Sequence, residues 1–328
     1  MQPRWSSAPN RRVRPVRVAP PRAEGLEERV VCSGVPTLEG VAAGPLPVRA
    51  EAQGPRARYL DVTRLANVPY TTTGTSTQLL DVYRPGGTPP PGGWPVVMAI
   101  HGGGWRRFSK EQYAAKVAPV LVARGYAVVA PNYTLSYPGA PSWPAPLVEL
   151  RQAVRWVRAN ASGLNLDGSK IAAMGESAGG HLALLLGTDP AGDDTKIQAV
   201  VDFFGPTDLA SLRLQSPGAR PAVDQLLGPG AYDPATLADA SPVSHVDPTD
   251  PPVLMIQGMA DGLVPFSQSR EMAVALTAAK VRNTLILIPG VGHGFGFRTG
   301  GRTILPAVLG FLDRSLGVAP VSGSSANP

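Results

Sequence analysis

A serine in a glycine-rich turn is the residue of this sequence best suited to nucleophilic chemistry. Ser177 lies in the run GESAGG at 175–180, between a short apolar stretch and a leucine-rich one. The pattern G-x-S-x-G is typical of a nucleophile elbow, a sharp strand-to-helix turn that exposes the serine hydroxyl at the start of a helix. A serine held in this way can attack a carbonyl carbon when a base, an orienting carboxylate and an oxyanion site lie nearby.

Four histidines are candidates for the base. His293 lies in GVGHGFGF, after the last apolar run, and its flanking glycines would let this loop fold over the serine. We therefore predict that His293 is the base. His181 follows Ser177 by one helical turn and is expected to pack locally, whereas His101 is expected to anchor its loop. His245 is interpreted as structural.

Asp261 is the carboxylate that best fits the orienting role. It lies just beyond the apolar run 253–256, and the chain order Ser, Asp, His is one of the orders in which such triads occur. Asp202 and Asp208 follow the preceding apolar run and compete for this role, although Asp208 is expected to cap a helix. Glu176, beside the serine, is expected to pair with a nearby loop.

The run HGGGW at 101–105 supplies the expected oxyanion site. Successive glycines let the backbone approach a substrate closely. The N–H groups of Gly103 and Gly104, together with that of Ala178, can then point at the negative charge that develops on the carbonyl oxygen.

From about residue 58, strand-like apolar runs alternate with segments of helical periodicity. Strands are expected at 59–63, 78–83, 96–100, 126–130, 171–174, 199–204, 253–256 and 284–288. Helices are expected at 109–123, around Leu147, Leu150, Val154 and Val157, after the elbow, near 266–280, and around Ile304, Val308, Leu309 and Leu312. This alternation predicts an α/β fold with a mostly parallel sheet and helices on both faces, and with the site at the carboxyl ends of the strands.

Composition and length favour one large domain. The 328 residues are 43% hydrophobic and 16% charged, which fits an α/β domain over 58–316. Residues 1–57 are rich in Arg and Pro without apolar periodicity, and are predicted to be a disordered basic arm. Residues 317–328 are predicted to be a flexible tail.

The formal net charge of +6 is concentrated near the N-terminus, where residues 1–58 contain ten arginines and no lysine or aspartate. The folded part is therefore nearly neutral, and we expect it to bind no nucleic acid. Cys32 is the only cysteine, which excludes an internal disulfide. No run approaches the roughly 20 apolar residues of a membrane-spanning helix and no clear signal peptide is present, so the cytoplasm is favoured. Nothing in the sequence indicates the oligomeric state.

The segment at about 206–250 is predicted to be a small lid that shapes the substrate pocket. The segment is rich in Pro, Gly and Asp, and apolar residues are spaced among them, namely Leu212, Leu226, Leu227 and Tyr232. Aromatic residues elsewhere could form pocket walls or pack in the core, namely Trp105, Tyr133, Tyr137 and Trp143.

Together these motifs resemble those of the α/β-hydrolase superfamily of esterases and lipases. They are closest to its hormone-sensitive-lipase-like group and its bacterial feruloyl- and acetyl-esterase-like (BD-FAE-like) group. The resemblance covers about 58–316 and rests on HGGGW, GESAGG, GMADGLVP at 258–265 and GHGF at 292–295, with LDVYRP at 80–85 and DFFGPTDL at 202–209 in support. The chain departs from these groups in its basic arm and in the absence of a dedicated N-terminal helical cap.

The resemblance implies a serine carboxylic ester hydrolase that needs neither a metal nor another cofactor. Ser177 would form an acyl-enzyme, His293 would transfer the proton, and Asp261 would orient the imidazole. The expected substrates are small-molecule esters with short-chain, acetyl or aryl groups.

Other functions stay open at this point. The chain could be an amidase similar to kynurenine formamidase, whereas a peptidase of the prolyl-oligopeptidase type is disfavoured because the chain has no room for a propeller. A non-enzymatic hydrolase-fold binding protein, or a nucleic-acid binder that uses the basic arm, would belong to a different class. Such proteins usually lose a triad residue, and this chain keeps all three candidates.

Overall fold

The computed structural model describes residues 62–74, 76–188 and 192–318. The predicted arm at 1–57, the start of the first predicted strand and most of the predicted tail lie outside these ranges. Within them, no helix combines the length and the apolar composition that crossing a bilayer requires.

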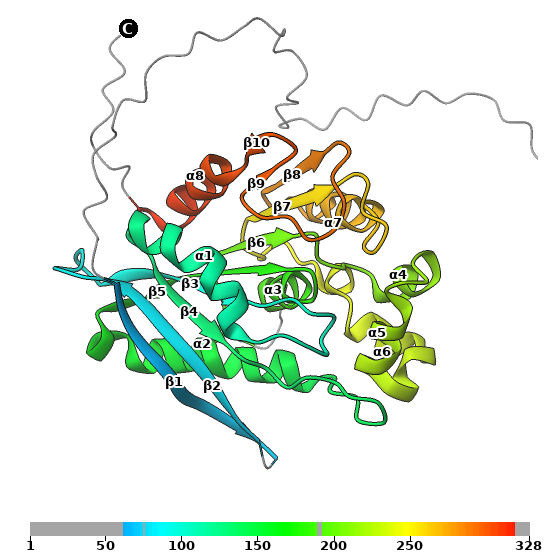
Figure 1. Ribbon diagram of the computed structural model, residues 1–328, viewed down its shortest axis with the longest axis horizontal. Coiled ribbons are helices and arrows are strands. Elements are labelled where there is room, and N and C mark those ends of the chain that lie inside the picture. The colour runs from blue at the N-terminus through cyan, green and yellow to red at the C-terminus, as the bar shows by residue number, and fades with distance from the viewer. Residues whose placement is uncertain (1–61, 75, 189–191, 319–328) are drawn as a thin grey trace, which may run out of the picture. The chain divides into compact units, whose positions relative to one another are not determined.

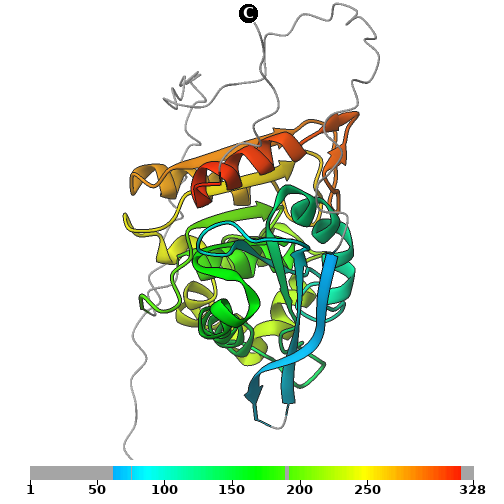
Figure 2. The ribbon, with the colours of Figure 1, turned by 90° about the vertical axis from the view of Figure 1, so that its left-hand side faces the viewer.

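A sheet of eight strands forms the centre of the described domain (Figure 1). The strands are β1 (Val62–Thr73), β2 (Ser76–Pro85), β3 (Trp94–Ile100), β4 (Ala127–Pro131), β5 (Leu166–Glu176), β6 (Ala199–Phe203), β7 (Val253–Gly258) and β8 (Asn283–Ile288). Their spatial order is β1-β2-β4-β3-β5-β6-β7-β8. The pairs β1·β2 and β2·β4 are antiparallel and every later pair is parallel. Figure 2 shows the blue β1–β2 hairpin at one edge of the sheet and the orange β8 at the other.

Helices cover both faces of the sheet, because alternate residues of its inner strands point to opposite sides. On β3, Val96, Met98 and Ile100 belong to the core on one face, whereas Val97 and Ala99 belong to the core on the other. The first face carries α2 (Ala145–Leu164), α3 (Ala178–Gly187) and α7 (Ser267–Ala278), and the second carries α1 (Lys110–Arg124) and α8 (Leu305–Leu316). The predicted α/β fold with a mostly parallel sheet is therefore confirmed.

The segment between β6 and β7 forms a group of short helices at the right of Figure 1. These are α4 (Leu209–Gln215), α5 (Arg220–Leu227) and α6 (Pro234–Asp239), with 3₁₀ turns η1 (Gly228–Tyr232) and η2 (Pro242–His245). Leu212, Leu226 and Leu227 are buried, whereas Tyr232 is 71% exposed and lies against the guanidinium of Arg213. A further two-residue hairpin, β9 (Arg298–Thr299) and β10 (Arg302–Thr303), precedes α8.

The first strand is longer than the sequence pattern predicts. The prediction ended at Thr63, but β1 continues to Thr73. Most β1 side chains are exposed, so the strand lacks the apolar alternation by which strands are recognised. Its pairing with β2 keeps it extended instead.

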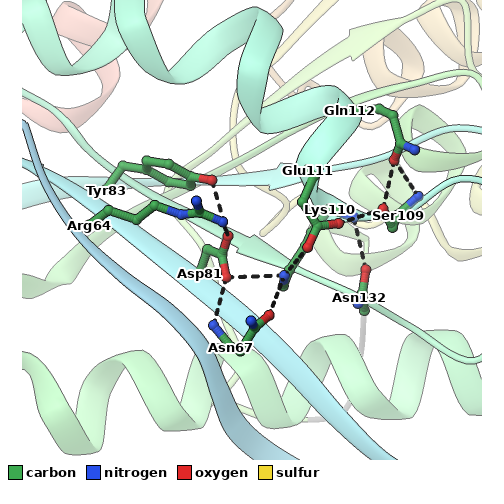
Figure 3. A network of polar contacts seen from close by, with 9 residues as sticks. All are labelled: Arg64, Asn67, Asp81, Tyr83, Ser109, Lys110, Glu111, Gln112 and Asn132. Atoms are coloured by element: carbon green, nitrogen blue, oxygen red, sulfur yellow. Dashed lines mark hydrogen bonds and ion pairs between the residues drawn. The ribbon is translucent and has the colours of Figure 1, made fainter.

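A buried ion-pair network joins this hairpin to the start of α1 (Figure 3). Lys110 and Asp81 are at most 1% exposed, and Lys110 Nζ lies 3.1 Å from Asp81 Oδ1. Lys110 Nζ also donates to Asn67 Oδ1 at 2.9 Å, and Arg64 Nη2 donates to Asp81 Oδ2 at 2.7 Å. Burial favours the neutral Asp81 carboxyl, but hydrogen bonds from the Asn67 backbone, Arg64 and Lys110 outweigh it and lower the pKa of Asp81.

The Asp81→Ala variant should be strongly destabilised, because it removes the buried counter-charge of Lys110 and leaves only the ion pair with the more exposed Glu111. We expect its free energy of unfolding to fall by about 3–5 kcal/mol near pH 7. The loss should shrink below the usual aspartate pKa, because the stabilisation disappears as the pH falls through the lowered pKa of folded Asp81. Urea unfolding across pH measures both effects.

Asp193→Ala is the matched control. This variant removes an exposed ion pair with Lys196 and should leave the unfolding midpoint unchanged. An Asp81→Ala midpoint equal to that of wild type would show that the buried network contributes nothing to stability.

Candidate active site

Ser177 lies in a strained turn between β5 and α3. Its backbone has φ 54° and ψ −121°, a conformation that is costly for a residue with a side chain. The Ser177 N–H donates to Phe203 O at 2.8 Å, which fixes the turn to the end of β6. Close packing leaves no space for side chains beneath it: a Cβ on Gly179 would lie 2.1 Å from Ile100 O, and one on Gly180 would lie 2.1 Å from Asp202 Oδ1.

The structure brings Ser177, His293 and Asp261 into one hydrogen-bonded chain. His293 Nδ1 lies 2.7 Å from Asp261 Oδ2, and His293 Nε2 lies 2.9 Å from Ser177 Oγ. In the tautomer that carries its proton on Nδ1, the imidazole donates a hydrogen bond to the carboxylate of Asp261. Nε2 is then unprotonated and can accept the hydroxyl proton of the serine. The three residues follow β5, β7 and β8, whose carboxyl ends lie at the same edge of the sheet.

The carboxylate of Asp261 is held on both oxygens. Oδ1 accepts the backbone N–H groups of Leu263 and Val264, both at 2.9 Å, and Oδ2 accepts Gln257 Nε2 at 3.1 Å in addition to His293. Gln257 is fully buried on β7. Its role is not among the predictions from the sequence, although one amide in the apolar run VLMIQG is a signal that a buried polar partner is needed.

Neither competing aspartate contacts His293 in the described structure. Asp208 caps α4, where its side chain accepts the N–H groups of Ala210 and Ser211. Asp202 is fully buried beneath the elbow, and burial raises its pKa to about 7. Its Oδ1 accepts the N–H of Gly205 at 2.9 Å, and no described residue pairs with its Oδ2.

Glu176 was predicted to pair with a nearby loop, but its partner belongs to a helix. Lys116 of α1 donates to both carboxylate oxygens of Glu176, at 2.8 and 2.9 Å.

The imidazole of His293 packs against Phe204, with ring centroids 4.7 Å apart.

The three predicted oxyanion donors line the same pocket as Ser177 and His293. Gly103 has φ 114°, and a Cβ there would lie 2.0 Å from Arg107 O, so a side chain cannot be accommodated. The N–H groups of Gly103 and Gly104 have no hydrogen-bond acceptor among the described residues. Ala178 is the first residue of α3, where helical geometry leaves the N–H without an intrahelical partner.

The other histidines hold loops in place. His101 anchors its loop, as predicted, whereas His181 bonds to residues far away in the chain and not only locally. His101 is stacked on Tyr133 with centroids 4.3 Å apart and bonds to Gly102 O. His181 Nδ1 accepts Trp105 Nε1–H at 3.2 Å, and its Nε2–H donates to Ala240 O at 2.8 Å. It thereby joins α3, the glycine-rich loop and the inserted segment.

The Nε2–H of His245 donates to the carbonyl of Asp239, six residues earlier in the chain, at 2.8 Å. This contact agrees with a structural role for His245.

The pocket over Ser177 has a volume of about 300 Å³. The inserted segment 206–250 contributes to its wall through Pro206, Leu212, Gly218, Ala219 and Ala222. Of the proposed aromatic walls, only Trp105 lines this pocket. Tyr133 and Tyr137 line a separate one, and Trp143 donates to Asp239 at 2.8 Å.

The sheet order, the serine turn after β5 and the loops that carry Asp261 and His293 define the α/β-hydrolase fold. A profile of the BD-FAE family matches residues 80–276, and the chain belongs to this family. It is 31% identical to the esterase LipQ of Mycobacterium tuberculosis, over 79% of this chain and 64% of LipQ. It is 32% identical to the esterase LipC of the same organism, over 69% of this chain and 59% of LipC. The chain thus spans less than two thirds of the length of these relatives.

A solved structure also shares the fold. A truncated carbohydrate esterase from gut microbiota superposes with a TM-score of 0.69 at 29% identity, over 81% of this chain and all of that one.

A second solved structure, the esterase Est2 of Thermogutta terrifontis, is similar at a TM-score of 0.65 and 26% identity. The match covers 82% of this chain and 97% of Est2.

The two buried histidines should make the fold sensitive to acid. Burial lowers the pKa of His101 and of His181 to about 4. Between about pH 4 and 6.5 the unfolded chain binds protons at these positions and the folded chain does not, so each histidine lowers stability as the pH falls. His181→Gln should be less stable than wild type at pH 7.5, and this difference should shrink by about 1.4 kcal/mol for each pH unit below 6.5.

Urea unfolding of both proteins at several pH values tests this prediction. Asp202, whose raised pKa acts in the opposite direction, is common to both proteins and cancels in the comparison. A stability difference that does not change between pH 7.5 and 4.5 would contradict a neutral, buried His181.

Proposed function

We propose that this protein is a serine hydrolase of carboxylic esters. The observation that carries the proposal is the chain of hydrogen bonds from Asp261 through His293 to Ser177, at the wall of a pocket of about 300 Å³. The printed names of the relatives, esterases and a carbohydrate esterase, support the same reaction class.

In the proposed reaction, His293 Nε2 takes the Ser177 proton as Oγ attacks the ester carbonyl carbon. The tetrahedral intermediate collapses to an acyl-enzyme, and the imidazolium gives the proton to the departing alkoxide. Water then repeats the sequence with His293 as base, which releases the acid and restores the serine. Asp261 holds the Nδ1–H tautomer and stabilises the imidazolium.

Gly103, Gly104 and Ala178 are proposed to bind the negative oxygen of each tetrahedral intermediate. We propose that their N–H groups point into the pocket before the substrate binds. Donors fixed in advance of the reaction stabilise developing charge most effectively, because they need not reorient during it.

Small or flat substrates fit this pocket best. Leu212, Ala219 and Ala222 of the inserted segment line the same pocket as Ser177, together with Leu263 and Val264, so they bound the space for the acyl or alcohol group. We propose that the segment 206–250 acts as a lid and that short-chain, acetyl and aryl esters are the preferred substrates.

Replacing Ser177 by alanine should abolish ester hydrolysis. Loss of a triad serine lowers turnover by up to about 10⁶-fold in a well-evolved enzyme. Release of p-nitrophenol from the acetate, butyrate and octanoate esters measures this loss, and we expect the rate to fall with acyl length.

Ser162→Ala, which changes an exposed serine on α2, is the control and should retain the wild-type rate. Equal rates for Ser177→Ala and wild type, or no hydrolysis by wild type, would refute the proposed function.

A further inference from the structure

The pocket over Ser177 is lined by basic residues that ester hydrolysis itself does not require. Arg106 and Arg107 follow the glycines and Trp105 directly, and both line the pocket together with Ser177 and His293. Arg106 is half-buried and Arg107 is exposed. Arginine side chains carry a positive charge in proteins.

No acidic side chain of the pocket neutralises these two charges. Glu176 is the only carboxylate among the described lining residues, and both of its oxygens are bound to Lys116. The guanidinium of Arg106 has no hydrogen-bond or ion-pair partner among the described residues. Arg107 lies over the ring of Phe108, 5.2 Å from its centroid, and no described carboxylate pairs with it. The described lining therefore has three cationic side chains, Arg106, Arg107 and Lys116, and one anionic side chain, Glu176.

The backbone holds these arginines in a fixed relation to the proposed oxyanion donors. Gly104, Trp105 and Phe108 all have positive φ, and the N–H of Arg106 donates to Gly103 O at 3.2 Å. Trp105 is 2% exposed and its indole is bonded to His181 of α3. This anchored loop fixes the backbone position from which the Arg106 side chain extends.

The rest of the pocket lining is mostly uncharged. The lining residues from the inserted segment and from the loop after β7 are Pro206, Leu212, Gly218, Ala219, Ala222, Leu263 and Val264. A substrate bound in this pocket therefore has both apolar side chains and guanidinium groups without a described carboxylate partner within its lining.

We propose that this pocket selects esters that carry a second, anionic group, such as a free carboxylate, which Arg106 binds with assistance from Arg107. The proposal rests on the proposed ester hydrolysis and specifies its substrate class. A guanidinium matches the two oxygens of a carboxylate in a planar, bidentate pair. Partial exclusion of water from the pocket strengthens this attraction relative to bulk solvent.

The anionic group could belong to the acyl or to the alcohol part of the ester, and two matched substrate pairs separate these cases. For the acyl side, mono-p-nitrophenyl adipate is compared with p-nitrophenyl hexanoate, which has a methyl group in place of the carboxylate. For the alcohol side, para-acetoxybenzoate is compared with its methyl ester. The measured quantity is the ratio of kcat/KM for the anionic ester to that for the neutral ester.

In wild type we expect this ratio to be about tenfold or more in at least one pair, the size typical of hydrogen bonds to a charged group. The ratio should fall as salt is added, because ions screen exposed charges. Arg106→Gln should bring the ratio close to one, and Arg107→Gln should lower it less because that side chain is more exposed. Arg270→Gln removes the same charge from an exposed position outside the pocket and should keep the wild-type ratio.

A wild-type ratio near one in both pairs, with the neutral esters hydrolysed, would overturn the selectivity and leave the proposed function standing. A high ratio that survives in the double variant Arg106→Gln/Arg107→Gln would also overturn it. Calorimetric binding of the adipate and hexanoate esters to Ser177→Ala tests the anion site without turnover. Tighter binding of the adipate ester is expected, and equal binding would contradict the proposal.

Discussion

The strained backbone at Ser177 is the constraint on which the rest of the structure depends. A positive φ at a serine persists only when its surroundings leave no alternative. Here β3 and β6 supply those surroundings: the Ser177 N–H is bound to the end of β6, and Gly179 lies so close to Ile100 that any side chain would overlap its carbonyl. The energy that holds the hydroxyl clear of the sheet therefore comes from the packing of the whole parallel core.

The same parallel sheet brings the other groups to the serine. Because β7 and β8 run parallel to β5, the loops that follow them reach the same edge, and Asp261 and His293 meet Ser177 there. The glycine-rich loop after β3 reaches this edge as well. It is secured at its far end by Lys110 in the buried network of Figure 3 and in its middle by the bond from Trp105 to His181.

The sequence predicts the elements of the fold and the residues that meet at Ser177, because these depend on local patterns. Apolar runs mark the buried strands β3 to β7, and glycines mark the elbow and the loop at 101–105. The extent of β1, the pairing of Glu176 with Lys116 and the support of Asp261 by Gln257 could not be predicted in this way. Each depends on contacts between segments far apart in the chain.

Covalent labelling tests most directly whether these contacts make Ser177 a nucleophile. Paraoxon transfers a diethyl phosphoryl group to an activated serine, and mass spectrometry of the intact protein and its peptides counts and locates the group. We expect one adduct, on Ser177, that forms much more slowly in His293→Ala. No adduct, an adduct on another residue, or an unchanged labelling rate in His293→Ala would contradict the account.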